Sequence, residues 1–278
     1  MSNFELSNEL STDQSNFKSL LTRVFGNKKV LYVLSLIIFF LLWQWMHITG
    51  FHNQQMAGPI QVLQELGKMA THKLAGHTLF GHLYISFRRV IIAFLIAAVI
   101  GVPLGILMGF SPLANAIIRP IFELFKPMPP ISWISLAILW FGISETSKVF
   151  IILIGAIVPL IINCYNGIRV VDGELYHVIR MLGGNRRHEI FQVMFPASFP
   201  TIFAGLQISL SMAWASVLAA ELVGAREGVG FIIVSGMNQS NTAMIFAGMV
   251  VIAITAFAIS AGLSYLERWV CPWKVEMH

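Results

Sequence analysis

Six stretches of this 278-residue sequence are apolar over lengths that match the hydrocarbon core of a lipid bilayer. A helix needs about 20 apolar residues to cross that core. Hydrophobic residues make up 56% of the chain and charged residues 11%, against roughly 25% charged in a soluble domain. The chain is therefore predicted to be an all-α integral membrane protein whose six spans are residues 30–48, 84–110, 114–141, 148–168, 198–223 and 243–266.

Basic residues orient these spans, because cytoplasmic loops are enriched in Lys and Arg. With both termini cytoplasmic, the inner side holds Lys18, Arg23, Lys28, Lys29, Arg119, Arg169, Arg180, Arg186, Arg187, Arg268 and Lys274. The outer side then holds Lys68, Lys73, Arg88, Arg89, Lys148 and Arg226, and Lys126 lies within the membrane. The predicted regions are a cytoplasmic segment (1–29), a transmembrane domain (30–268) and a cytoplasmic tail (269–278). The start of the chain lacks the plan of a cleaved signal peptide, so the first span is expected to remain as an anchor.

The third span contains three prolines within four residues, Pro127, Pro129 and Pro130. Each removes a backbone donor and crowds the preceding turn, so the helix is predicted to break there. Glu123 and Lys126 precede the break, three positions apart on one helix face. Two interpretations stay open: an ion pair that only holds the broken helix, or direct contact with a permeating solute.

Four further side chains are candidates for the translocation pathway. Glu221 near the outer end of the fifth span is expected to serve a gate or an inter-helix hydrogen bond. Trp133, Trp140 and Trp214 would line a cavity, or alternatively anchor at the lipid interface or pack between helices.

The second span carries Gly101, Gly105 and Gly109, which fall on one helix face and let a neighbouring backbone approach closely. We interpret this stripe as helix packing. At the outer end of the same span, Arg88 and Arg89 are expected to extend to the membrane interface.

The external segment before the second span is expected to form a short surface helix over residues 59–69. His47, His52, His72, His77 and His82 lie in or beside this segment, but their spacings match no ligand motif, so no metal site is expected. Cys164 and Cys271 provide no disulfide framework.

A polar stretch, residues 171–197, separates the fourth and fifth spans on the cytoplasmic side. Val178, Met181 and Leu182 recur at helical spacing until Gly183-Gly184-Asn185 interrupts them. A second short amphipathic run follows and is predicted to stop at Pro196. This pattern predicts a compact folded loop on the membrane surface, where another protein would bind.

Motifs of nucleotide binding and catalysis are absent from the sequence. Neither G-x-x-x-x-G-K-[ST] nor H-E-x-x-H, Cys-x-x-Cys or G-x-S-x-G occurs. The chain is predicted not to be an enzyme and to bind no cofactor. If ATP drives it, a separate subunit must bind the ATP and Mg.

The cytoplasmic loop resembles the signature loop of ABC importer permeases. That family has Glu-Ala-Ala, then Gly, nine intervening residues and an apolar-x-apolar-Pro ending. Gly183 and Val193-Met194-Phe195-Pro196 match this pattern, whereas His177-Val178-Ile179 stands in place of Glu-Ala-Ala. Residues 120–130, 140–148 and 219–225 resemble the nitrate, sulfonate and taurine branch of these permeases, and residues 271–274 are similar to taurine permeases.

The resemblance implies a type I permease fold with a cytoplasmic coupling helix, in the bacterial inner (plasma) membrane. The implied partners are a second permease copy, two ATPase subunits, a periplasmic or lipid-anchored solute-binding protein and membrane lipid, with no nucleic acid. The implied ATPase-coupling residues are Asp172, His177, Arg180, Met181, Gly183, Arg186, Arg187 and Pro196.

The resemblance favours taurine or an alkanesulfonate as the imported solute. Nitrate, bicarbonate or an aromatic acid is the alternative within the same machinery. A stand-alone channel or proton-coupled carrier is an alternative of another class, but it would leave the cytoplasmic loop without a role. An intramembrane enzyme is disfavoured by the missing catalytic motifs.

Overall fold

The computed structural model describes residues 28–50, 56–222 and 224–271. Most of the predicted segment 1–29 and residues 272–278 of the predicted tail lie outside this range, as do His52 and Val223. The chain divides into two units, Met1–Gln64 and Glu65–His278. Within the described ranges the structure is helical and contains no β-strand.

The first unit contains α2 (Lys28–Ile48) and the beginning of α3 (Pro59–Thr71), which confirm the predicted first span and short helix. Apolar side chains of α2 are exposed; Phe39, for example, is 59% exposed. Lipid is the solvent that suits such a helix. Near its end, the Trp43 indole N–H donates to the Ala57 carbonyl at 3.0 Å.

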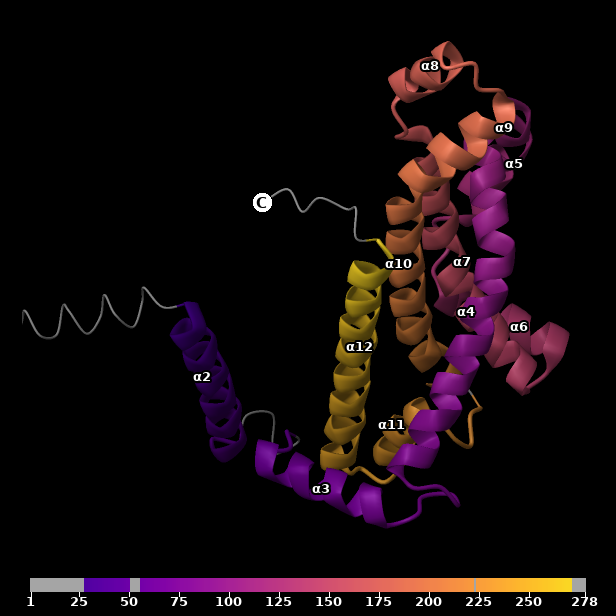
Figure 1. The fold of residues 1–278 in the computed structure, drawn as a ribbon. Coiled ribbons are helices and arrows are strands. Elements are labelled where there is room, and N and C mark those ends of the chain that lie inside the picture. The colour runs from indigo at the N-terminus through magenta and orange to yellow at the C-terminus, as the bar shows by residue number, and fades with distance from the viewer. Residues whose placement is uncertain (1–27, 51–55, 223, 272–278) are drawn as a thin grey trace, which may run out of the picture. The chain divides into compact units, whose positions relative to one another are not determined.

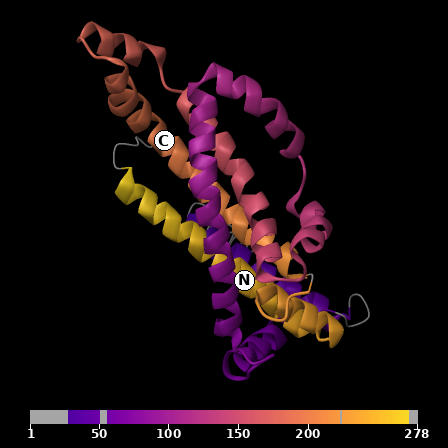
Figure 2. The ribbon, with the colours of Figure 1, turned by 90° about the vertical axis from the view of Figure 1, so that its right-hand side faces the viewer.

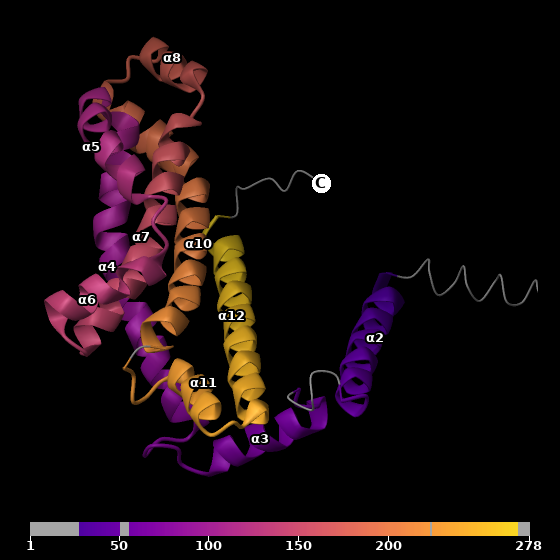
Figure 3. The ribbon, with the colours of Figure 1, turned by 180° about the vertical axis from the view of Figure 1, so that it is seen from behind.

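The second unit is a bundle built around α4, α7 and α10, with α12 beside α10 (Figures 1 and 3). Its elements are, in order, α4 (Leu79–Phe110), α5 (Pro112–Phe125), η1 (Pro130–Trp133), α6 (Ile134–Phe141), α7 (Glu145–Arg169), α8 (Gly173–Met181), α9 (Arg186–His188), η2 (Glu189–Met194), α10 (Phe195–Leu222), α11 (Val229–Asn238) and α12 (Thr242–Val270).

Among the described residues, five helices are long and apolar enough to cross a bilayer, and the number of spans is six when one bent pair is counted as a span. The bent pair joins α5 to Pro130–Phe141 at an angle of 87°, so the proline-rich break is confirmed. Figure 2 shows α5 leaving the end of α4 and the chain turning back into α6. Two spans begin earlier than predicted, α4 at Leu79 and α7 at Glu145.

The glycine stripe on α4 packs directly against α7, as predicted. A Cβ added at Gly105 would lie 2.6 Å from the Cys164 Cβ and 2.8 Å from the Ile161 carbonyl oxygen. A Cβ added at Gly109 would lie 2.7 Å from Ile168. The two backbones therefore approach more closely than any larger residue would allow.

The prediction that the helix stops at Pro196 is wrong. Residues Arg186–Leu222 form one continuous span in which η2 is a π-helical turn. The Phe195 N–H donates to the Ile190 carbonyl, five positions back. This wider turn makes room for a proline ring immediately after it, and proline is tolerated in the first turn of the α-helix that follows.

Candidate functional site

The loop over residues 171–197 lies at the end of the bundle opposite α11, with α8 at its tip (Figure 1). The predicted helix forms as α8, and Asp172 is its N-cap: its carboxylate accepts from the Glu174 N–H at 3.0 Å. This contact satisfies a backbone donor that has no partner inside the helix. The sequence-predicted residues Asp172 and His177 thus lie at the start and middle of one short helix.

The predicted glycine turn ends α8 in a Schellman motif. Gly183 has a φ of +78°, a conformation that glycine adopts without a steric penalty. The Gly184 N–H donates to the Ile179 carbonyl at 2.8 Å, and the Gly183 N–H donates to Arg180 at 3.0 Å. These two bonds close the last turn of the helix and fix the direction in which the chain leaves it.

The two arms of the loop are tied to each other. Asn185 caps α9 by accepting from the Arg187 and His188 N–H groups at 3.0 and 3.3 Å. The Arg180 guanidinium contacts the Glu189 carboxylate at 2.5 Å, and this hydrogen bond raises the pKa of Arg180 above its ordinary value. Caps at both arms and an ion pair between them make the loop a defined structural element.

Apolar side chains are displayed at the tip of this loop. Met181 is 87% exposed and Leu182 is 81% exposed, and His177 and Arg187 are exposed beside them. Arg186 instead lies over the Phe110 ring at 5.2 Å, where it joins the loop to the end of α4. An exposed apolar group with a charged border is typical of a protein-binding surface.

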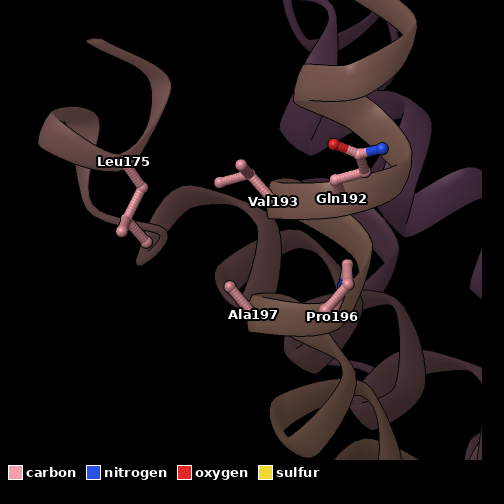
Figure 4. A pocket seen from close by; sticks show the side chains of 5 residues that line it. All are labelled: Leu175, Gln192, Val193, Pro196 and Ala197. Carbon is pink, nitrogen blue, oxygen red and sulfur yellow. The ribbon is translucent and has the colours of Figure 1, made fainter. Parts of the chain in front are cut away.

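A cavity of about 380 Å³ lies between α8 and the helix that leads into the membrane. It is lined by Leu175, Gln192, Val193, Pro196 and Ala197. Figure 4 shows Leu175 on the α8 side, with Val193 and Ala197 on the side facing it. The lining is mostly apolar, and it includes Pro196.

The charged pair of the broken span forms as its spacing predicted. Lys126 contacts the Glu123 carboxylate at 3.2 Å, and Arg119 approaches the same carboxylate at 3.9 Å. All three side chains line a second cavity, of about 210 Å³, together with Tyr165 and Asn166 of α7.

The three candidate tryptophans lie in different surroundings. Trp214 is buried in the core, and its indole N–H donates to the Ile252 carbonyl at 3.1 Å. Trp140 is 57% exposed. Trp133 follows the break, with its ring centre 6.2 Å from that of Phe150. Its indole nitrogen is buried without a hydrogen-bond partner among the described residues.

Glu221 is fully buried and held by several donors. The Ser86 hydroxyl donates to its carboxylate at 2.7 Å, an Arg89 nitrogen at 2.7 Å and the Gly230 N–H at 2.9 Å. The inter-helix hydrogen bond expected of Glu221 therefore forms. Its partner Arg89, however, is 1% exposed, so the prediction that Arg89 extends to the interface is wrong.

Arg89 is the buried centre of a charge cluster that was not predicted from the sequence. Its guanidinium contacts Glu145 of α7 at 2.6 and 2.7 Å, and also donates to the Glu227 carbonyl at 3.0 Å. Lys148 contacts the same Glu145 at 2.6 Å. The cluster links α4, α7, α10 and the turn before α11, because a charge buried in the membrane requires such partners.

One signal in the sequence would have found this cluster. Arg89 continues the glycine stripe in steps of four residues, through Ala93 and Ala97 to Gly101. Residues at this spacing share one helix face, so Arg89 belongs to the packed face of α4. Arg88 lies off that face and is exposed.

His77 and His82, two of the five histidines considered in the sequence, make structural contacts. The His82 ring contacts the Leu74 carbonyl at 2.9 Å and accepts from the Gly228 N–H at 3.0 Å. His77 contacts Glu227 at 3.3 Å. No group of His, Cys, Asp or Glu residues suited to a metal ion occurs within the part of the chain that the structure describes.

This helical arrangement resembles that of solved ABC transporters. A structure of the MetNI methionine ABC transporter in inward-facing conformations aligns with a TM-score of 0.61 and 17% identity, over 69% of this chain and 95% of that chain. A second crystal form aligns with a TM-score of 0.58. The chain therefore has the type I ABC permease fold.

The family follows from the sequence itself. Residues 101–274, more than half of the chain, match the family of binding-protein-dependent transport system inner membrane components, and the chain belongs to that family. It is a multi-pass permease subunit of an ABC importer, which translocates solute and is not an enzyme.

Relatives define the branch within this family. The chain is 36% identical to the taurine transport system permease protein TauC of Escherichia coli (strain K12), over 79% of this chain and 80% of that protein. It is 38% identical to the putative aliphatic sulfonates transport permease protein SsuC of Bacillus subtilis (strain 168), over 70% and 71%. It is 28% identical to the nitrate import permease protein NrtB of Synechocystis sp., over 92% and 94%. The chain thus belongs to the nitrate, sulfonate and taurine branch, as predicted.

Proposed function

We propose that this permease imports taurine or an alkanesulfonate, and that α8 is the coupling helix through which a partner ATPase drives the transport. One observation carries the coupling proposal. A short helix with closed caps displays Met181 and Leu182, each more than four-fifths exposed, beyond the end of the membrane bundle. Exposed apolar side chains of this kind mark a site where another protein binds and removes them from water.

Coupling requires a rigid connection between α8 and the membrane spans, so that a movement of α8 also moves the spans. The Schellman turn at Gly183 and the ion pair between Arg180 and Glu189 hold α8 to the second arm of the loop. That arm continues without interruption into α10. A rigid-body movement of α8 would therefore move α10, which is the kind of movement that alternating access needs.

The proposed complex contains two copies of the permease, two ATPase subunits and an external solute-binding protein. ATP and Mg would bind to the ATPase subunits, because this sequence contains no nucleotide-binding motif. Because the ATPase subunits are cytoplasmic in this proposal, the loop faces the cytoplasm, and both termini lie on that side. His177, Arg180, Arg186 and Arg187 would lie at or beside the ATPase contact.

The solute assignment is supported by the names of two relatives, which refer to taurine and to aliphatic sulfonates. Nitrate is the second candidate, because the nitrate import permease aligns over 92% of this chain. Both kinds of solute are small oxyanions, so one plan of transport serves either.

Reconstitution tests the proposal. The permease is placed in liposomes with its ATPase and with binding protein supplied outside, and uptake of labelled taurine, ethanesulfonate and nitrate is measured. We expect sulfonate uptake that requires ATP inside the liposomes. Uptake by the permease alone would refute coupling and favour a channel or carrier, and uptake of nitrate alone would refute the sulfonate assignment.

A further inference from the structure

The cavity between α4, α5 and α7 collects charged and polar groups inside a membrane span. Arg119 and Glu123 of α5, and Lys126 at its C-cap, line a volume of about 210 Å³ together with Tyr165 and Asn166 of α7. Met108 lies two residues before the end of α4, and Tyr165 and Asn166 lie within four residues of the end of α7, so the cavity is at the end of the bundle that carries α8. Two cations, one carboxylate and two neutral polar groups therefore line one common space.

The ion pairs in this cavity are easily exchanged. The Glu123 side chain is 47% exposed, that of Lys126 41% and that of Arg119 54%. Pairs with this exposure stabilise a protein by only about 0–1 kcal/mol. A solute that carries its own charges would replace these contacts at little cost.

The cavity holds positive and negative side chains at a spacing that matches the two charged ends of a small zwitterion. Two cations flank one carboxylate at positions 119, 123 and 126, which share one helix face. Glu123 and Lys126 are three residues apart, or about 4.5 Å along the axis. A two-carbon spacer between an ammonium and a sulfonate covers about 4 Å from its bond lengths.

We propose that this cavity is a solute-binding station on the translocation path, selective for an aminosulfonate zwitterion. Lys126 and Arg119 bind the sulfonate and Glu123 binds the ammonium group. This inference rests on the proposed function and deepens it by naming the feature of the solute that the permease recognises. The volume supports a small solute, since pockets for larger ligands hold about 300–1,000 Å³. A simple anion such as nitrate has no ammonium group and would leave Glu123 without a solute contact.

Glu123→Gln tests the role of the carboxylate in the reconstituted complex, at subsaturating solute, where the uptake rate reports affinity. Taurine is compared with ethanesulfonate, which lacks only the ammonium group. We expect the ratio of taurine to ethanesulfonate uptake to fall roughly tenfold, the effect of losing one charged contact. Lys126→Gln should instead lower uptake of both solutes, because both carry the sulfonate.

The matched control is Glu65→Gln on α3. Glu65 and Lys68 also form an ion pair three residues apart, at 3.1 Å, outside the cavity. This variant should leave the uptake ratio unchanged. If Glu123 only stabilises the broken helix, Glu123→Gln lowers both uptakes equally, and the double variant Glu123→Lys with Lys126→Glu restores both. These two results together would contradict the proposal that the cavity binds solute.

Failure of the station is distinguishable from failure of the proposed function. A wild-type complex that imports nitrate and neither sulfonate contradicts the solute assignment, and the zwitterion site with it. A wild-type complex that imports taurine, with an unchanged ratio in Glu123→Gln, contradicts only the station.

Discussion

Arg89 and Glu221 form an ion pair across two helices at 2.7 Å, although 132 positions separate them in the chain. The two side chains are 1% and 0% exposed. The Arg89 guanidinium also contacts Glu145 of α7. One side chain of α4 therefore holds α7 and α10, and through the Glu227 carbonyl it holds the turn that precedes α11.

Removal of Arg89 should destabilise the permease severely. Arg89→Met leaves the buried carboxylate of Glu221 without its cation, and breaking a buried pair in this way costs about 3–5 kcal/mol. We expect a lower thermal transition of the detergent-solubilised protein, measured by size-exclusion chromatography after heating. Arg88→Met is the control, since Arg88 is exposed on the same helix. Equal transitions for the two variants would contradict the role given to Arg89.

The glycine at the start of α11 should be required by the Glu221 side chain. A Cβ added at Gly230 would lie 2.6 Å from the Glu221 Cβ, so Gly230→Ala must displace the fully buried Glu221 side chain. Overpacking of this kind costs about 1–3 kcal/mol, and the same heating assay would measure it. Gly262→Ala on α12 has no neighbour within 4 Å and should leave the transition near that of the wild type.

Replacing Gly105 with a larger residue should prevent α4 and α7 from packing closely. Gly105→Val would place methyl groups against the Cys164 side chain and the Ile161 carbonyl, where even a single Cβ comes within 2.6 Å. We expect the helices to separate and Cys164, which is now fully buried, to react with a membrane-permeant maleimide. Protection of Cys164 as complete as in the wild type would show that the packing tolerates the change.

The turn after α8 should couple the ATPase to transport only if Gly183 keeps its conformation. A β-branched residue at a φ of +78° is strained by about 1–2 kcal/mol, so Gly183→Val should release α8 from its position. We expect inserted permease that retains ATP hydrolysis in the complex but loses uptake. Gly183→Asn should keep most uptake, because Asn tolerates this region. Equal uptake by both variants would show that the conformation of Gly183 is not needed for coupling.

The exposed apolar tip should carry part of the ATPase affinity. Met181→Asp places a charge in the proposed contact without disturbing the helix interior, because the Met181 side chain is 87% exposed. We expect at least a tenfold weaker association with the ATPase subunit in a pull-down titration, about 1.4 kcal/mol. Val170→Asp is the control: Val170 is 78% exposed but precedes the loop. A similar loss in both variants would indicate a general charge effect.

Local patterns explain why much of this protein was predictable. The length of an apolar stretch specifies a span in lipid, and three prolines within four residues break a helix. The glycine at 183 was recognised as a turn because a positive φ is a property of one residue and its neighbours. The spans, the bent third span and α8 all followed from such patterns.

Pro196 shows where a local pattern misleads. Proline usually ends a helix, yet a π-helical turn immediately before it widens the backbone and lets η2 and α10 continue as one span. Nothing in the flanking residues indicated that turn. Its consequence is functional, because the continuous helix connects the proposed coupling loop to the membrane core.

The sequence by itself determined the membrane class of this protein, its spans, its broken helix and the existence of a folded loop between the fourth and fifth spans. Only the tertiary structure decided which charges meet. From the sequence, Arg89 was predicted to lie at the membrane interface. In the structure its face of α4 packs against α7 and α10, and Arg89 pairs there with Glu145 and Glu221. Charges in a membrane are stable only when they are paired, and pairing over 132 positions depends on how whole helices pack.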